Sequence, residues 1–378
     1  MRNWCAILFA LCAVACLDSA RADVTISLSP SVQNSARGLE LVFSGTLTNT
    51  SAGKVFLNDI VPTLSGASAT NLAFQPNAFF SNVPGVLLPG ESYSNDELFR
   101  VLLTGAAPPG DYGGTVTVRG GADIFADADL ASGPFSVLSP AVSVAATDAS
   151  ASEFGPDPGV IVISRTGSTA IDLPVAIAIS GTAVNGIAFG LVPASLNIPA
   201  GSRTATVMIA PLPNNLAEGD RTAILSLNLT AAYNAGLSIS DGVIIHDKPA
   251  DAWRFENFGA SANDPAAADG GDWEGDGIHN LLEFALALDP KESDPQALPA
   301  ALVADDYLTF SFVPNSAAAD VQYVVEASTS LVSWNADDVE EVSLLDPDPP
   351  GVRTFRYRFP VSETSEAFLR LRVSRTNL

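Results

Sequence analysis

The pattern of hydrophobic and polar residues changes character several times along the chain. Up to about residue 138, short runs of valine, leucine, phenylalanine and threonine alternate with turn clusters such as SPSVQNSARG, NTSAGK and APPGDYGG. Short runs separated in this way predict the antiparallel strands of a β-sandwich. In the run LELVFSGTLTN, the period of two places Leu41, Phe43 and Leu47 on the inward face.

Aromatic residues of this first segment have two readings. Tyr112, Phe79, Phe80 and Phe99 either fill the core or form an exposed ligand platform. Aromatic rings contribute much of the buried area in sandwiches, so we expect core positions for all of them.

Two later segments repeat the β-pattern. The runs VIVIS, LPVAIAIS, RTATVMIAPL, TAILSLNL and GVIIHD predict a second sandwich at residues 139–249. The runs YLTFSFV, VQYVVEAS, FRYRFPV and FLRLRVS predict five or more strands at residues 296–378.

Four arginines alternate with apolar residues in the last two of these runs, and we expect them on one outer face. They are Arg356, Arg358, Arg370 and Arg372. Such a face either binds an acidic polymer or pairs with acidic neighbours, and the negative charge of the chain favours pairing.

Residues 250–295 have a helical rather than a strand pattern. The segment WRFENFG supplies Trp253, Phe255 and Phe258, which we expect to pack against the residues that follow. A later run has the helical spacing of one apolar face and ends at Asp289-Pro290. Its members are Ile278, Leu281, Leu282, Ala285 and Leu288.

Between these two parts lies DWEGDGIHNLLE, whose oxygen-bearing residues have the spacing of a calcium loop. An EF-hand-type loop supplies ligands from its first, third, fifth, seventh, ninth and twelfth residues and has glycine at the sixth. The ligands here are Asp272, Glu274, Asp276, the Ile278 carbonyl, Asn280 and Glu283, with Gly277 at the turn.

Glu274 departs from the usual Asp or Asn at the third position, and its longer side chain requires a wider cage. The alternative interpretation is an Asp/Gly turn that caps a helix, because turns and caps favour the same residues. We favour Ca²⁺, the one cofactor that the sequence predicts. Glu283 falls in the first turn of the helix, so ion binding and helix docking should be coupled.

Charge and composition exclude several functions. The chain has 42 Asp and Glu against 18 Lys and Arg, and this negative field disfavours nucleic acid and anionic lipid as partners. A nucleophile elbow of the form Gly-x-Ser-x-Gly is missing. The two histidines, His246 and His279, have no partner at metal spacing. We therefore predict no enzyme and no catalytic residue, although sequence leaves open a pair of glycosidase carboxylates.

Residues 1–22 have the features of an export signal: Arg2, an apolar run to Leu17 and small residues at Ala20 and Ala22. All three cysteines lie in this segment, and a lipid anchor at Cys16 stays open as a second interpretation. We expect a secreted or cell-surface protein without a transmembrane segment.

Several motifs of residues 140–247 carry a family resemblance. They are Arg165-Thr166-Gly167, Gly181-Thr182-Ala183, Ile198-Pro199-Ala200-Gly201 and Glu218-Gly219-Asp220. With them the segment resembles a Calx-beta domain over its whole length. The resemblance implies a seven-stranded Ig-like sandwich, which binds calcium at one tip in the sensor members of the family.

The resemblance also implies where the acidic ligands of that tip would lie. Glu153, Glu218 and Asp247 match acidic positions, whereas Ala188 and Arg221 occupy two others and Asn214 replaces a further charge. Lost carboxylates and an added cation lower the affinity for a divalent ion.

The remaining segments resemble the C-terminal arrangement of exported proteins of Verrucomicrobia, in which a thrombospondin type 3 or dockerin-like loop precedes a small β-domain. The matching residues are Trp253-Arg254, Phe258-Gly259, the calcium loop, Asp289-Pro290, and Ser328, Leu331 and Trp334. The resemblance implies a single calcium loop that links two β-domains.

Together these features predict a mainly β protein: tandem Ig-like β-sandwiches with a short helical calcium-loop linker before the last sandwich. The expected segments are 1–22, 23–138, 139–249, 250–295 and 296–378. We expect a non-enzymatic adhesion, interaction or matrix protein in which calcium stiffens the linker. The alternative is a carbohydrate-binding accessory protein that uses Trp273 and Trp334. For this protein we expect an unknown protein or polysaccharide as partner, and the oligomeric state is open.

Overall fold

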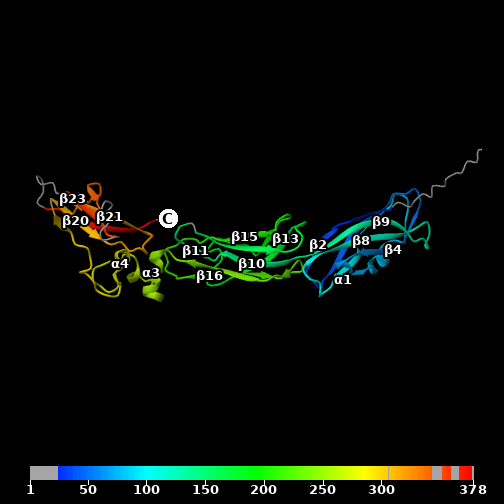
Figure 1. Ribbon diagram of the computed structural model, residues 1–378, viewed down its shortest axis with the longest axis horizontal. Helices are drawn as coiled ribbons and strands as arrows, with labels where there is room; N and C mark the ends of the chain where they lie inside the picture. The colour runs from blue at the N-terminus through cyan, green and yellow to red at the C-terminus, as the bar shows by residue number, and fades with distance from the viewer. Residues whose placement is uncertain (1–23, 156, 305, 343–350, 359–365, 377–378) are drawn as a thin grey trace, which may run out of the picture.

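The computed structural model describes residues 24–155, 157–304, 306–342, 351–358 and 366–376. The predicted export signal lies outside these residues. Three β-units follow one another in an elongated row, with the helices α3 and α4 between the second and third units (Figure 1). The prediction of a mainly β protein with tandem Ig-like sandwiches is confirmed.

The first sandwich has two antiparallel-rich sheets, ordered β1-β3-β7-β5 and β2-β9-β8-β4-β6. Its strands are β1 (Val24–Leu28), β2 (Val32–Asn34), β3 (Glu40–Asn49), β4 (Val55–Leu64), β5 (Leu72–Gln75), β6 (Val86–Leu87), β7 (Ser92–Leu103), β8 (Gly110–Gly121) and β9 (Ala128–Ser139). Two short helices, α1 (Ala67–Asn71) and α2 (Asn77–Asn82), lie beside them.

Stacked phenylalanines hold these two sheets together. Phe43 lies parallel to Phe99, with ring centroids 4.9 Å apart, and both rings meet Phe135 edge-on. These rings are 0–2% exposed, so they carry much of the hydrophobic stabilisation of this unit. The predicted inward positions of Leu41, Phe43 and Leu47 are confirmed.

The expected core positions are confirmed for Tyr112, Phe79 and Phe99, but the prediction for Phe80 is wrong. Phe80 is 57% exposed. It follows Phe79 in α2, a six-residue helix at the surface. Consecutive helical side chains point in different directions, so burial of Phe79 turns Phe80 toward solvent.

The second sandwich has a four-stranded sheet, β15-β12-β10-β17, and a five-stranded sheet, β11-β18-β16-β13-β14. Its strands are β10 (Ala141–Asp148), β11 (Ser150–Ser152), β12 (Gly159–Arg165), β13 (Leu173–Ser180), β14 (Ser195–Ile198), β15 (Thr204–Ile209), β16 (Arg221–Asn228), β17 (Asn234–Ala235) and β18 (Ser240–His246). The resemblance implied seven strands. Two short edge strands, β11 and β17, raise the number of strands above seven, and they pair in parallel with β18 and β10, respectively.

Direct hydrogen bonds join the first and second sandwiches. The Ala36 amide donates to the Ala231 carbonyl over 2.7 Å, and the Asn234 side chain accepts from the Arg37 amide. The same Asn234 amide donates to Ser139, at the end of β9. Only Pro140 separates β9 from β10. The connection between these sandwiches is therefore short, and hydrogen bonds join the two sandwiches beside it.

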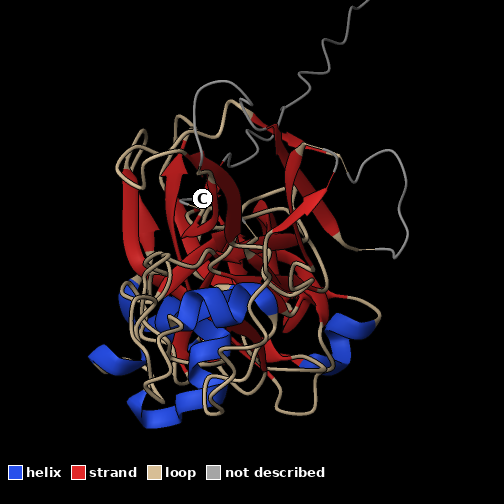
Figure 2. Cartoon of the chain, turned by 90° about the vertical axis from the view of Figure 1, so that its left-hand side faces the viewer, coloured by secondary structure: helices blue, strands red, loops and turns tan. Residues whose placement is uncertain are grey.

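The helical segment contains α3 (Pro249–Phe258), η1 (Gly259–Ser261), η2 (Pro265–Ala267) and α4 (Asn280–Leu286). Helices gather on one side of the molecule when it is viewed along its length (Figure 2). The predicted helix is shorter than expected, because Ala287 has the left-handed conformation that ends α4. Leu288 lies beyond the end, and the buried residues of α4 include Phe284 and Ala285.

The third β-unit has a four-stranded sheet, β19-β20-β23-β22, and a two-stranded sheet, β21-β24. Its strands are β19 (Leu302–Ala304), β20 (Tyr307–Phe312), β21 (Val321–Ser328), β22 (Val339–Glu341), β23 (Arg353–Arg358) and β24 (Phe368–Arg375). The expectation of five or more strands is confirmed.

The predicted single arginine face is wrong, because β23 and β24 belong to different sheets. Pairing with acidic neighbours is confirmed for three of the four arginines. Arg356 binds Glu340, while Arg370 and Arg372 share Glu326.

Among the described residues, the helices are all too short or too polar to cross a lipid bilayer.

The phenylalanine core yields a matched pair of substitutions. We expect Phe99→Ala to lower the free energy of unfolding of the first sandwich by about 3–5 kcal/mol, because it leaves a cavity beside the rings of Phe43, Phe74 and Phe135. Phe80→Ala removes an exposed ring and should change stability by less than about 1 kcal/mol. Chemical denaturation of the full chain measures both, and equal effects would contradict this account of the core.

Candidate metal centre in the helical junction

The loop before α4 has a compact turn organised by its first carboxylate. Asp272 accepts hydrogen bonds from the backbone amides of Gly275, Asp276 and Gly277 over 2.8–3.1 Å. Gly275 and Gly277 have φ values of 81° and 93°, which favour glycine. The spacing of glycine and aspartate therefore folds the loop around the Asp272 side chain.

The side chains of the first, third and fifth loop residues converge. Asp272, Glu274 and Asp276 each offer a carboxylate oxygen, and these oxygens lie within 4.8 Å of one another. Asp276 also accepts from the amides of Ile278 and Asp294 over 2.8 Å. The structure thus brings together three of the predicted ligands.

Glu283 extends this cluster from α4. Glu283 is 1% exposed, and its Oε2 atom has no hydrogen-bond partner among the described residues. Both carboxylate oxygens of Glu274 are buried without a donor as well. Buried carboxylate oxygens that lack donors are costly, so this arrangement requires a cation or a proton.

The pKa of Glu283 shows the same electrostatic conflict. Burial raises the pKa of its carboxyl group to about 8, and the neighbouring carboxylate of Glu274 adds to the rise. Burial likewise raises the pKa of Glu274. By contrast, hydrogen bonds from Gly277 and its neighbours lower the pKa of Asp272.

Asn280, the predicted ninth-position ligand, also braces the loop. Its side-chain amide donates to the carbonyls of Ala266 and Ala268 over 2.7 and 2.8 Å. Its Oδ1 atom is buried and has no donor. Ile278 is 2% exposed, which anchors the seventh loop residue against the protein. These two ligands stay predictions, and Asn280 has a structural role in addition.

The loop residues fit an oxygen-preferring cation such as Ca²⁺. None of the ion pairs among the described residues involves Asp272, Glu274, Asp276 or Glu283. All of the predicted ligand atoms are oxygens, which is the ligand set of a hard cation. The capping interpretation explains Asp272 but leaves the buried oxygens of Glu274 and Glu283 without partners.

Aromatic contacts connect this loop to α3. Trp273 packs on Phe258 with ring centroids 4.8 Å apart. Trp253 then meets both Phe258 and Phe284, at 5.9 and 5.4 Å. The predicted packing of Trp253 and Phe258 is confirmed, whereas Phe255 is 40% exposed.

The helical segment also shares a core with the third β-unit. Ala250, Phe284 and Ala285 cluster with Ala318 and Val321. Two hydrogen bonds reinforce this contact: the Tyr323 hydroxyl donates to the Ala285 carbonyl, and the Asn315 side chain donates to the Phe284 carbonyl, both over 2.8 Å. Movement of α4 must therefore disturb the third β-unit.

Arg375, at the end of β24, binds three carboxylates from separate parts of the chain. It lies 2.8 Å from Asp251 of α3, 2.8 Å from Asp269 before the loop and 3.0 Å from Asp320 before β21. Arg254 binds Asp251 as well. Sequence analysis missed this cluster, because no spacing rule links an arginine near the C-terminus to acids in three other segments.

On its other side, the helical segment touches the second sandwich. Asn263 exchanges hydrogen bonds with the backbone of Ala217 in both directions. Gly219 lies against the ring of Phe255, where a Cβ atom would come within 2.5 Å. The segment thus contacts both the second sandwich and the third β-unit.

The tip of the second sandwich holds another acidic cluster. Carboxylate oxygens of Glu153, Glu218 and Asp247 lie within 4.8 Å of one another. Arg221 binds Glu153 over 2.5 Å and Glu218 over 2.8 Å. Burial raises the pKa values of Glu153 and Asp247.

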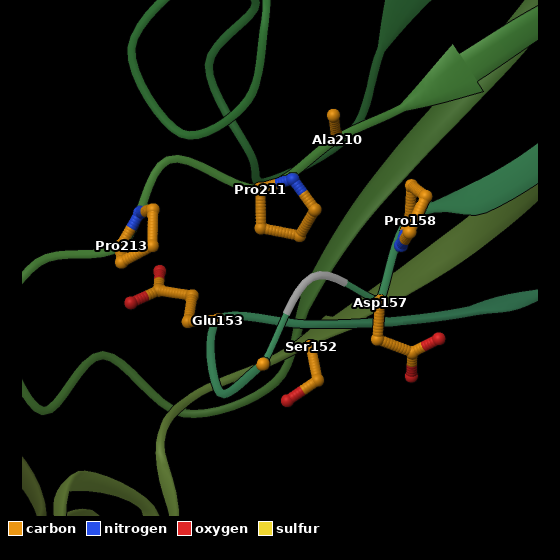
Figure 3. A pocket seen from close by; sticks show the side chains of 8 residues that line it. Ser152, Glu153, Asp157, Pro158, Ala210, Pro211 and Pro213 are labelled. Carbon is orange, nitrogen blue, oxygen red and sulfur yellow. The ribbon is translucent and has the colours of Figure 1, made fainter. Parts of the chain in front are cut away.

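A pocket of about 360 Å³ adjoins this tip (Figure 3). Its walls include Pro158, Ala210, Pro211 and Pro213, and Glu153 lies at one edge below Pro213. The walls are mostly apolar, so they add few groups that could hold a cation beside Glu153.

Arg375 provides a test of the junction. We expect Arg375→Met to destabilise the protein by about 3–5 kcal/mol, because the buried carboxylates of Asp251 and Asp320, each 1% exposed, lose the guanidinium that binds them. Arg372→Met is the control, since Arg372 is 51% exposed and its loss should cost less than about 1 kcal/mol. Thermal and chemical unfolding measure the difference; similar losses would show that the cluster around Arg375 is not structural.

Comparison with known proteins gives only distant similarities. No family model matches the sequence, and no curated protein matches it. The apo form of the Calx CBD1 domain is 17% identical, covers 28% of this chain and 96% of its own, and has a TM-score of 0.24. The Escherichia coli adhesin FdeC is 11% identical over 95% and 93% of the two chains, with a TM-score of 0.28. A titin tandem is 6% identical over 93% and 97%, with a TM-score of 0.27. Similarities at this level assign no function.

Proposed function

We propose that this chain is a non-enzymatic adhesion, interaction or matrix protein whose helical junction is stiffened by one calcium ion. Asp272, Glu274, Asp276 and Glu283 would supply carboxylate oxygens. The Ile278 carbonyl and Asn280 would complete the set at the seventh and ninth positions.

One observation carries this proposal: the loop buries carboxylate oxygens of Glu274 and Glu283 that have no hydrogen-bond donor. A divalent cation would satisfy these oxygens and neutralise the mutual repulsion of the four acids. Affinity should be modest, with Kd on the order of 10⁻⁴ to 10⁻³ M, as in extracellular calcium modules.

The ion would stiffen the junction because its ligands lie on both sides of a turn. Asp272 and Glu274 flank Trp273, which packs on Phe258 of α3, while Glu283 belongs to α4. Calcium would therefore hold α3 and α4 in one arrangement. Without the ion, repulsion between Glu274 and Glu283 favours an open loop.

We further propose that residues 250–295 and the third β-unit unfold as one unit. The shared core around Phe284 and the ion pairs of Arg375 support this grouping. Their boundary with the second sandwich is made of fewer apolar residues, namely Ala217 with Phe258, Ala262 and Ala267.

The signal-like residues 1–22 and the acidic surface support export to the cell surface or medium. An elongated row of sandwiches (Figure 1) suits a protein that spans distance and presents surfaces to a partner protein or polysaccharide. The arrangement of a partner-binding surface on such a scaffold depends on the stiffness of the junctions.

The carbohydrate-binding alternative receives less support. Trp273 packs on Phe258, and the guanidinium of Arg370 lies 4.3 Å from the ring centroid of Trp334. One face of each indole ring is thus occupied by a contact within the chain, although Trp273 is 40% exposed.

Calcium titration tests the proposed site directly. We expect the full chain to bind one Ca²⁺ in calorimetry, and saturating calcium at 100 times Kd should add about 2.7 kcal/mol to the stability of the cooperative unit. Glu283→Gln should weaken binding at least tenfold and stabilise the calcium-free protein at neutral pH, because the buried carboxyl group with its raised pKa must either stay charged or take up a proton, and glutamine does neither.

Glu292→Gln is the matched control, since Glu292 is exposed and nearby. It should bind calcium as the unaltered protein does. Equal losses in both variants, or unchanged binding in Glu283→Gln, would exclude the proposed ligand set.

Limited proteolysis tests the stiffening. A chelator should increase cleavage within residues 250–295 and the third β-unit several-fold and leave cleavage within the second sandwich unchanged, because only the unit that contains the loop depends on the ion. Mass spectrometry of the fragments locates the cuts. A protease pattern and melting temperature that ignore the chelator would refute the structural role of calcium.

A further inference from the structure

The tip of the second sandwich gathers acids in the way a metal site does, but it already contains a cation of its own. We propose that the Arg221 guanidinium takes the place of a divalent ion there, so that this tip binds no calcium in the unaltered protein.

The three acids reach the tip from separate segments. Glu153 follows β11, Glu218 precedes β16, and Asp247 follows β18. Their backbones are fixed by the surrounding strands, so their negative charges are held together whether or not an ion is present. Such a cluster requires a positive partner.

Arg221 supplies that partner from inside the cluster. Its Nη2 atom donates to Glu153 over 2.5 Å, and its Nη1 atom forms an ion pair with Glu218 at 2.8 Å. The side chain of Arg221 is 11% exposed and that of Glu153 is 1% exposed. One guanidinium thus bridges two carboxylates, as a bound metal ion would.

The remaining donors are also provided by the chain. The Asn214 side-chain amide donates to both Glu153 and Glu218 over 3.1 Å. Asp247 accepts from the backbone amides of Glu218 and Gly219 over 2.8 and 2.7 Å. Of the carboxylate oxygens of this cluster, only Asp247 Oδ1 is both buried and without a donor.

The contrast with the calcium loop is chemical. At the loop, buried oxygens of Glu274 and Glu283 lack donors, and no described ion pair reaches them. At the tip, a guanidinium and an amide already point at the acids. A divalent ion could enter only by displacing Arg221, because two cations at this distance repel each other and would compete for the same oxygens.

The pocket beside the tip supports the same conclusion. Pro158, Pro211 and Pro213 line it, so Glu153 has an apolar neighbourhood on that side (Figure 3). Because the Glu153 side chain is 1% exposed, water compensates little of its charge, and the ion pair with Arg221 must do so.

The exchange of a metal for a guanidinium has a consequence for the junction. The tip forms the surface on which the helical segment rests, through Gly219 against Phe255 and Ala217 against Asn263. Because Arg221 neutralises the tip, this surface has the same arrangement with and without calcium. Calcium would therefore act only on the loop side of the helical segment. This consequence rests on the proposed function, whereas the assignment of Arg221 does not.

The test uses the full chain with the loop site disabled by Glu283→Gln. Calorimetric titration with Ca²⁺ should show no binding at the tip up to millimolar concentration. Adding Arg221→Ser should create a binding event, with Kd at least tenfold below the highest concentration tested. Adding Asp247→Asn to that double variant should abolish it.

Arg203→Ser in the same background is the matched control, since Arg203 is exposed and lies in the same sandwich, and it should create no site. Circular dichroism checks that each variant is folded. A folded Arg221→Ser variant that binds no calcium would overturn the proposal.

A second measurement does not depend on the folding of the Arg221 variant. Asp247→Asn in the otherwise unaltered protein should leave the calcium stoichiometry and affinity unchanged. If Asp247→Asn removes a binding event, the tip holds calcium and the proposal is wrong. If the unaltered protein binds no calcium while Arg221→Ser gains a site, the loop proposal fails and the Arg221 assignment stands.

Discussion

The burial of carboxylates without hydrogen-bond donors is the constraint on which the helical junction depends. Glu283 is 1% exposed in α4 and faces Glu274 of the loop, and both have oxygens without donors. Like charges in a poorly hydrated place cannot all stay ionised without a counter-charge. No ion pair among the described residues reaches these two carboxylates, so they need a proton or a cation, and we propose a divalent cation.

The buried carboxylates near this junction are neutralised in two ways: by a proposed calcium ion at the loop, and by arginine side chains elsewhere. At the tip of the second sandwich, Arg221 neutralises Glu153 and Glu218 from within the chain. A third cluster, around Arg375, joins α3 to the end of β24 in the same manner. In this account the built-in cations fix the surfaces on either side, and the calcium loop between them is the adjustable element.

Local patterns predicted much of this architecture, and long-range contacts limited the rest. Alternation placed Phe43 inward, and ligand spacing found Asp272, Glu274 and Asp276, which the structure brings together. Helical spacing extended α4 to Leu288, although a left-handed Ala287 ends it earlier. The split of the arginines between two sheets, and the position of Arg375 among three distant acids, depend on tertiary pairing that no local period encodes. The sequence showed that Arg221 replaces an acidic residue of the family, but only the structure shows that it bridges Glu153 and Glu218.

Hydrogen exchange of the full chain with and without calcium tests the central claim most directly, because it reports the order of each segment separately. The account predicts that calcium slows exchange at residues 272–286 and in α3, with little change in β3 or β12. Equal exchange of the loop and α4 under both conditions would contradict it.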